Sequence, residues 1–258
     1  MEISVSAEEV LLRIGGALSG DGAGPGGIHI LLACAPKSGS TFLSSAIANL
    51  PDFTKADLTL GYGRREQELC IFHCAATHSA NYVAQHHTRY SDTTGGLIRA
   101  FRLFPVVLTR NLFDTVVSLR DHLLTRPMVA LAYVDEAFVS WEEERQLDFV
   151  IDFCLPWYAN FAACWAQYDG PGMRVRYQDL VERPAETVRL IAAAAGAAFP
   201  REVAEQAVAS VRREDMRFNV GRAGRGREVL SRAQIARIHS LLEPYGRMSA
   251  VQELLTVG

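Results

Sequence analysis

A lysine, three hydroxyl side chains and a glycine are adjacent in the segment 36–41, which reads PKSGST. The apolar run 28–33 before it predicts a strand, and apolar residues at helical spacing over 42–50 predict a helix after it. A short turn between a strand and a helix directs backbone N–H groups and a helix N-terminus toward one place, which suits an anion. Lys37 adds a positive charge there. We therefore expect this turn to bind a phosphate or sulfate group.

The order of residues in this turn differs from that of the ATP- and GTP-binding loop. That loop reads GxxxxGK[ST], with its lysine directly after the last glycine and a Ser or Thr that holds magnesium. Here Lys37 comes two positions before Gly39, and no glycine opens the turn. The pattern therefore argues against the usual ATP- or GTP-binding loop.

A second strand-to-helix transition carries an arginine and a serine. The apolar segment 105–109 predicts a fully buried strand, Arg110 follows it, and a helix is predicted over 114–124. Ser118 lies eight positions after Arg110, two turns along that helix. Since arginine offers phosphate a forked, charge-assisted contact and serine adds a hydroxyl, the pair predicts a second anion site.

Two further segments carry residue types that suit a nucleotide. The segment 222–227 reads RAGRGR, in which the glycines let the backbone approach an oxyanion and the arginines supply charge. The segment 177–180 reads YQDL and places a tyrosine at the end of a predicted strand.

These four motifs, in this order, resemble those of the sulfotransferases that use 3′-phosphoadenosine 5′-phosphosulfate (PAPS). The first turn with the phenylalanine after it is similar to the family's PKSGTTW, and Arg110 and Ser118 keep the family's spacing. The segment 177–180 resembles YEDL, and 222–227 resembles RKGxxG. In the last motif alanine replaces lysine, the glycine spacing is one residue shorter and the usual tryptophan is missing. Which arginine of 222–227 would contact phosphate therefore stays open.

The resemblance implies a role for each motif residue. Lys37 would act in catalysis at the phosphosulfate bridge. The cradle around that bridge would consist of Ser38, Gly39, Ser40 and Thr41. The aromatic side chains at the adenine would be Phe42 and Tyr177. The residues that bind the 3′-phosphate would be Arg110, Ser118, Arg222, Gly224 and Arg225.

Sulfuryl transfer also requires a base that removes the proton of the acceptor, and histidine is the side chain that titrates near neutrality. The resemblance implies a catalytic histidine on the strand before the 3′-phosphate arginine. His87 stands 23 positions before Arg110 and is our preferred base. His86 stays an alternative, because adjacent residues of a strand face opposite sides and only one of the two can face the site.

The implied reaction is in-line transfer of a sulfuryl group from PAPS, as co-substrate, to a hydroxyl or amine of a small-molecule acceptor, with no metal. A kinase for nucleosides or small molecules on the same scaffold is one alternative, which the missing GxxxxGK[ST] disfavours. A catalytically silent nucleotide-binding relative is another, which the full set of site residues disfavours. Separately, the spacing of Cys70, His73, Cys74 and His78 would allow a zinc site, but we favour the interpretation that these side chains pack in the core.

The motifs require strands that alternate with helices. Strands are predicted at 28–33, 81–90, 105–109 and 173–177. Helices are predicted at 67–77, 97–104, 114–124, 185–195, 203–211 and 234–242, with two more within 141–169 and a loop at 51–65. This alternation predicts an α/β fold with a central parallel β-sheet flanked by helices, and the resemblance implies a P-loop NTPase-like sulfotransferase fold.

Length and composition limit the class of protein. The chain of 258 residues, 49% hydrophobic, is expected to form a single sulfotransferase domain, with an N-terminal helix and a glycine-rich linker over 1–27. A net charge of −3 argues against a nucleic-acid partner. No apolar run reaches the roughly 18 residues of a membrane span. Five scattered cysteines are typical of reduced thiols, so we expect a cytoplasmic enzyme, and a homodimer stays open.

Overall fold

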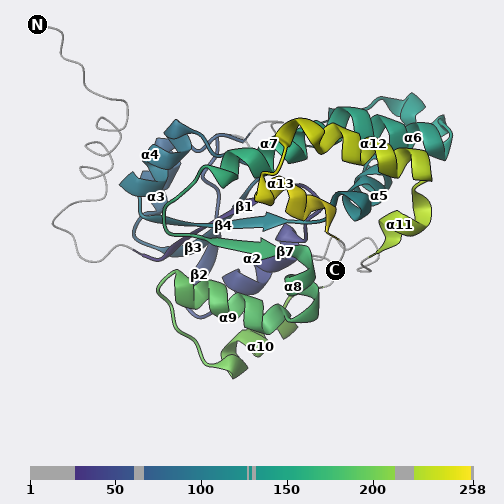
Figure 1. Ribbon diagram of the computed structural model, residues 1–258. Coiled ribbons are helices and arrows are strands. Elements are labelled where there is room, and N and C mark those ends of the chain that lie inside the picture. The colour runs from purple at the N-terminus through teal and green to yellow at the C-terminus, as the bar shows by residue number, and fades with distance from the viewer. Residues whose placement is uncertain (1–26, 61–66, 127, 130–131, 213–223, 257–258) are drawn as a thin grey trace, which may run out of the picture.

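A computed structural model describes residues 27–60, 67–126, 128–129, 132–212 and 224–256, so the helix and linker predicted before Gly27 lie outside the described residues. Its centre is a five-stranded sheet in which every pair of neighbouring strands is parallel (Figure 1). In spatial order the strands are β2 (Phe53–Ala56), β3 (Asn81–His86), β1 (His29–Cys34), β4 (Leu103–Thr109) and β7 (Met173–Arg176).

Helices cover both faces of this sheet, as the alternating pattern predicted (Figure 1). Ile30 and Leu32 of β1 pack with α2 (Ser40–Ala48), α9 (Pro184–Ala194) and α10 (Arg201–Ala209). Leu31 and Ala33 face the opposite side, with α3 (Ile71–Thr77), α4 (Asp92–Ala100), α5 (Leu112–Leu123), α7 (Leu155–Ala166) and α12 (Arg232–Leu242). Because both faces are buried, β1 is apolar from Ile30 to Cys34 rather than alternating.

The shorter elements complete the described chain. They are α6 (Glu143–Phe149), α8 (Tyr177–Glu182), α11 (Arg225–Val229), α13 (Ser249–Gln252), the hairpin strands β5 (Met128–Val129) and β6 (Ala132–Tyr133), and the short turns η1 (Glu136–Ser140), η4 (Glu243–Tyr245) and η5 (Glu253–Leu255).

Parallel pairing brings the carboxyl ends of the strands to one edge of the sheet. In the register of β1 and β4, Cys34 lies opposite Leu108, and the N–H of Ala35 donates to the carbonyl of Leu108 over 3.3 Å. The segments that follow these strands, 35–39 and 110–111, therefore begin side by side, and each leads directly into a helix.

The expected strand 81–90 ends at His86, and three other sequence-based boundaries were wrong, each for a local reason. The expected loop 51–65 contains β2, an edge strand whose exposed Thr54 and Lys55 give no apolar alternation. The expected helix 67–77 begins only at Ile71, because the N–H of Cys70 donates to Leu58 over 2.7 Å and keeps the preceding residues extended. The expected helix 97–104 is α4, which starts earlier because the Ser91 side chain caps it.

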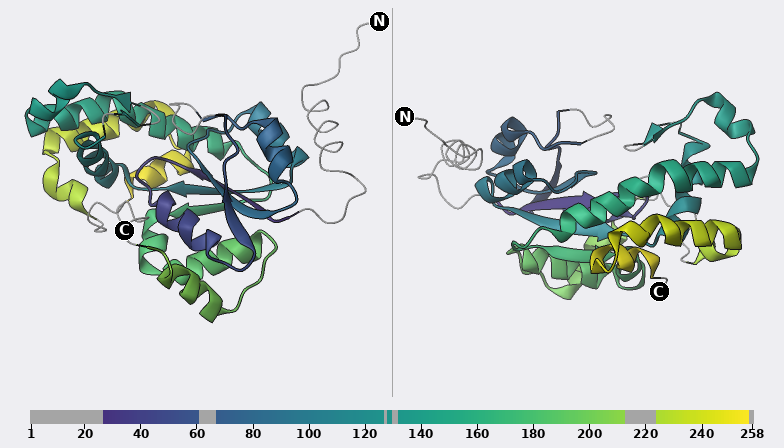
Figure 2. Two further views of the ribbon diagram at one scale, coloured as in Figure 1. Left: turned by 180° about the vertical axis from the view of Figure 1, so that it is seen from behind. Right: turned by 45° about the horizontal axis from the view of Figure 1, so that its top comes forward.

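The helices predicted within 141–169 run on from one another through a wider π-helical turn. This turn, η2 (Val150–Cys154), joins α6 to α7 (Figure 2). Pro156 follows at the start of α7 and has no N–H to donate to the carbonyl of Asp152. A proline at that position disturbs the regular hydrogen-bond ladder, which accounts for the local widening.

The cysteines agree with the expectation of free thiols. All five are unpaired, four are buried, and Cys164 is half-buried. Within the described ranges, no helix combines the length and the apolar character that crossing a membrane would demand.

Candidate functional site

The turn after β1 has the shape of an anion-binding turn. Lys37 (φ 65°) and Gly39 (φ 87°) both adopt left-handed backbone conformations, and the hydroxyl of Ser38 donates back to the carbonyl of Ala35 over 2.6 Å. Gly39 directly precedes α2 as its N-cap residue and has no side chain with which to cap that helix. The first N–H groups of a helix have no partner within the helix itself, so this end of α2 suits an anion.

We call the two strand-to-helix connections, the turn 36–41 and the segment 110–111, the two corners of the site. The second corner contacts the first directly. Arg110 follows β4, and its Nη1 donates to the carbonyl oxygen of Lys37 over 3.2 Å. The guanidinium carbon of Arg110 also lies 4.1 Å from the centre of the Tyr177 ring. That ring in turn packs on Gly39, where a Cβ would lie only 3.0 Å from it. The ends of β1, β4 and β7 thus form one continuous group of site residues.

The charge of Arg110 is only partly compensated by the protein. Its side chain is 10% exposed, and Nη2 lies 3.6 Å from a carboxylate oxygen of Asp114. The buried Nε has no hydrogen-bond partner among the described residues. A buried donor on a charged group without a partner is costly, and an anionic ligand beside it would remove that cost.

Asp114, which the sequence analysis did not single out, ties the glycine-rich segment to this corner. Its carboxylate accepts hydrogen bonds from the N–H groups of Gly226 (2.8 Å) and Gly224 (3.0 Å) and from Asn111 Nδ2 (3.0 Å). Although burial alone would raise the pKa of Asp114, these hydrogen bonds and the charge of Arg110 hold that pKa below its usual range. The carboxylate therefore stays charged at neutral pH.

The described part of the glycine- and arginine-rich segment 222–227 lies along α5. Arg225 Nη2 donates to Asp121 Oδ2 over 3.1 Å, and Arg227 lies over the ring of Phe113. Ser118 is buried on the same helix, between the turns that carry Asp114 and Asp121. Arg222 lies outside the described residues. The structure thus brings the segment from Gly224 onward to the helix that carries Ser118.

Hydrogen bonds join the first two turns of α2 to β3. Gln85 donates to the hydroxyl of Ser40 and accepts from the hydroxyl of Ser44, each over 2.9 Å. Thr41 is half-exposed beside them, and Phe42 is half-buried against the core on this face. Gln85 therefore faces the same side of the sheet as the anion-binding turn.

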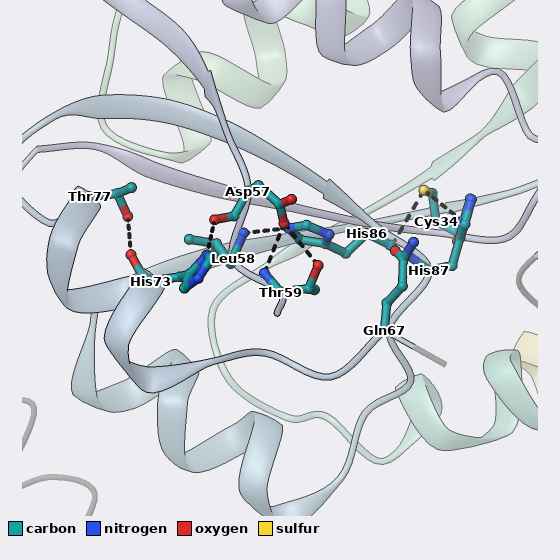
Figure 3. Close-up of polar contacts among 9 residues, drawn as sticks. All are labelled: Cys34, Asp57, Leu58, Thr59, Gln67, His73, Thr77, His86 and His87. Atoms are coloured by element: carbon teal, nitrogen blue, oxygen red, sulfur yellow. Dashed lines mark hydrogen bonds and ion pairs between the residues drawn. The ribbon is translucent and has the colours of Figure 1, made fainter. Parts of the chain in front are cut away.

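His86 and His87, the two residues after Gln85, point to different sides, as Figure 3 shows. His86 faces the opposite side, is 1% exposed, and its Nε2 accepts from the N–H of Leu58 over 2.9 Å. Burial lowers the pKa of His86 to about 4, even though nearby Asp57 acts in the other direction. A neutral ring that already uses its acceptor nitrogen on the backbone is a structural histidine.

His87 lies on the side of the anion-binding turn 36–41. Its Nδ1 lies 2.8 Å from the carbonyl oxygen of Cys34, the last residue of β1 (Figure 3). Since a carbonyl oxygen can only accept, Nδ1 must carry the proton of a neutral ring, which leaves the basic lone pair on Nε2. The backbone N–H of His87 donates to Gln67 Oε1 over 2.7 Å, so Gln67, which the sequence analysis did not single out, helps to fix this residue.

A shallow hollow lies beside Arg110 and Tyr177, at the ends of β4 and β7. Its lining consists of Thr109, Arg110, Asn111, Arg176, Tyr177, Gln178, Glu253 and Thr256. The last two come from the C-terminal segment, to which the sequence analysis gave no role. The hollow leaves open space next to the two residues that the motifs placed at the 3′-phosphate and the adenine.

Comparison with solved structures defines the class of fold. Mouse sulfotransferase SULT7A1 complexed with PAP superposes with a TM-score of 0.65 and 16% sequence identity, over 96% of this chain and 92% of that chain. Retinol dehydratase in complex with androsterone and inactive cofactor PAP gives 0.59 and 13%, over 92% and 85%. Sulfotransferase STF1 from Mycobacterium tuberculosis H37Rv gives 0.50 and 12%, over 93% and 82%. The chain has the sulfotransferase fold.

The similarity to these proteins is detected in the structure and not in the sequence. No protein-family model matches the chain, and no curated protein matches it either.

Proposed function

We propose that this protein is a PAPS-dependent sulfotransferase that acts on a hydroxyl or amine of a small-molecule acceptor. The observation that carries the proposal is the hydrogen bond from Arg110 to the carbonyl of Lys37, which joins the two anion-binding corners. A nucleotide with phosphate groups at both its 5′ and 3′ positions needs two such corners close together. The sulfotransferase fold supports the same conclusion.

The proposed nucleotide lies with its 5′-phosphosulfate in the turn 36–41 and its 3′-phosphate between Arg110, Ser118 and the segment that starts at Gly224. Two features of the protein support this placement. Gly39 supplies no side-chain cap to the N-terminus of α2, and the buried Nε of Arg110 has no partner among the described residues. Both are donors that a phosphate group would satisfy.

In the proposed reaction the acceptor oxygen or nitrogen forms a bond to sulfur while the bond from sulfur to the bridging phosphate oxygen breaks. His87 Nε2 takes the proton of the acceptor. Lys37 and the N–H groups of the turn stabilise the negative charge that develops on the leaving 5′-phosphate of adenosine 3′,5′-bisphosphate (PAP). Positioning and electrostatic stabilisation would supply most of the rate enhancement, as they do in phosphoryl transfer.

The proposed acceptor is a small molecule with an apolar body. Retinol dehydratase, which shares the fold, has been crystallised with androsterone and with retinol. In this chain the exposed apolar side chains Leu60 and Phe72 lie on the segments that follow β2, and Leu58, two residues before Leu60, donates its N–H to His86. We therefore place sterols and long-chain alcohols first in an acceptor panel, followed by phenols and amines.

The experiment that tests this function combines binding with transfer. Titration calorimetry should show tight binding of PAP without metal and weak binding of magnesium-ATP, and ³⁵S-labelled PAPS should label at least one acceptor of the panel. Stronger binding of magnesium-ATP than of PAP would favour a kinase instead. Tight PAP binding with no transfer to any acceptor would favour a catalytically silent relative.

A further inference from the structure

Tyr158 reaches from α7 into the turn that holds Lys37. Its hydroxyl donates to the carbonyl oxygen of Pro36 over 2.9 Å, although the two residues are 122 positions apart in sequence. The side chain is only 2% exposed, so water does not compete for this hydroxyl. Burial raises the pKa of Tyr158 well above its usual range, and the hydroxyl therefore remains a donor at every physiological pH.

Two successive carbonyl groups of the turn are thus held from outside it. Tyr158 holds that of Pro36, and Arg110 Nη1 holds that of Lys37 over 3.2 Å. In a trans peptide group the C=O and the N–H point in opposite directions, and the described chain contains no cis peptide bond. The two held carbonyls share their peptide groups with the N–H groups of Lys37 and Ser38. Both N–H groups are therefore directed away from Tyr158 and Arg110, toward the opposite side of the turn.

The backbone of Lys37 needs such support. Its φ of 65° lies in the left-handed region, which residues with a side chain rarely adopt. A conformation of this kind persists only where surrounding contacts fix it. The hydrogen bonds from Tyr158 and Arg110 are made to the two peptide groups on either side of the Lys37 Cα, where they determine this conformation.

We propose that Tyr158 is a positioning residue for sulfuryl transfer: by holding the Pro36 carbonyl, it presents the N–H groups of Lys37 and Ser38 to the 5′-phosphate end of the nucleotide. This inference rests on the proposed function for the identity of the ligand. Tyr158 acts only through the turn, so its effect is specific to the 5′ end, whereas Arg110 holds the turn and also serves the 3′ end together with Ser118.

The test compares Tyr158→Phe with a matched control. The substitution keeps the ring and removes only the donor. Tyr168→Phe is the control, because the hydroxyl of Tyr168 also donates to a proline carbonyl, that of Pro171, over 2.9 Å but away from the turn. The ligands are adenosine 5′-monophosphate and adenosine 3′-monophosphate, measured by calorimetry. We expect Tyr158→Phe to weaken binding of the 5′-monophosphate roughly 5- to 30-fold and to leave the 3′-monophosphate unchanged. Tyr168→Phe should change neither.

Amide hydrogen exchange adds a readout that needs no ligand. In Tyr158→Phe the N–H groups of Lys37 and Ser38 should exchange faster than in the wild type, while those of β1 stay protected. An equal loss for both nucleotides, no loss for either, or unchanged exchange in the turn would overturn the role of Tyr158. A wild-type protein that binds neither nucleotide would refute the proposed function instead, and the exchange measurement would still decide whether Tyr158 positions the turn.

Discussion

The backbone N–H of Gly226 donates to Oδ1 of Asp114 over 2.8 Å, across 112 positions of sequence. Gly224 bonds the other carboxylate oxygen over 3.0 Å. A Cβ on Gly226 would lie 2.1 Å from the backbone of Phe113, so the close approach requires glycine at that position. One buried carboxylate therefore fixes the glycine-rich segment beside the corner that carries Arg110.

We predict that Asp114→Asn destabilises the protein and weakens binding at the 3′ end of the nucleotide. An amide of the same shape has one oxygen and one NH₂ group, so at least one of the two glycine N–H groups would face a donor. The loss of a buried acceptor costs about 1–3 kcal/mol. Urea unfolding should show this loss, and the affinity for adenosine 3′-monophosphate should fall more than that for the 5′-monophosphate.

The control for this substitution is Asp121→Asn, on the same helix. Asp121 pairs with Arg120 and Arg225 and accepts no hydrogen bond from a glycine N–H among the described residues, so its replacement should cost less stability than that of Asp114. Equal stability losses for the two variants would show that the glycine N–H groups bound by Asp114 do not depend on its carboxylate.

Local sequence patterns predicted the elements that carry strong local signals. The strand β1, the turn at Lys37 and the helix α2 follow one another within about twenty residues, and the apolar run and helical spacing identify them directly. The parallel sheet covered on both faces followed from the alternation of such units. The edge strand β2 was missed because its exposed residues show no apolar pattern.

The contacts that complete the candidate site join residues far apart in sequence, which no local pattern encodes. Asp114 bonds Gly226, Tyr158 bonds Pro36, and His87 bonds Gln67 and Cys34. Asp114 had one usable signal, its position four residues after Arg110. No local pattern could tell which of His86 and His87 faces the turn, because the register of β3 determines it.

Lys37→Ala should reduce turnover by roughly 10²–10³-fold, the usual cost of removing one donor that stabilises charge in the transition state. The chain has two lysines, and the other one, Lys55 on β2, supplies a matched control because its Nζ donates to the hydroxyl of Ser45, in the second turn of α2, over 2.8 Å. Steady-state sulfate transfer should be close to normal in Lys55→Ala. Both variants should unfold near the wild-type temperature, and near-normal turnover in Lys37→Ala would remove this residue from the mechanism.

His87→Ala should abolish sulfate transfer, by roughly 10²–10⁴-fold, while PAP binding is retained. The reason is that Nδ1 of His87 donates to the carbonyl of Cys34, which leaves the basic lone pair on Nε2, whereas His86 is buried on the opposite side of the sheet against Leu58. His86→Ala should therefore mainly lower stability and leave the residual transfer rate per folded molecule much higher than in His87→Ala. The reverse order of the two transfer rates would show that His86 is the base.

The buried ring of His86 should make the protein less stable as the pH falls from about 6.5 to 4. Burial lowers its pKa to about 4 in the folded state, against an ordinary value near 6.5. Between these values the unfolded chain binds a proton that the folded chain does not, so the free energy of unfolding decreases as pH falls through this window. The full effect is about 3 kcal/mol, at 1.36 kcal/mol per pH unit.

Urea unfolding at a series of pH values measures this slope, and His86→Gln is the variant that isolates it. The glutamine oxygen can accept the Leu58 N–H without titrating, so the variant should lose much less stability between pH 6.5 and 4 than the wild type. A part of the slope should remain, because burial also lowers the pKa of His78. The lowered pKa values of Asp57 and Asp114 act in a separate window, below about pH 4, where those carboxylates become protonated. Identical slopes above pH 4 in variant and wild type would mean that His86 is not held neutral by the fold.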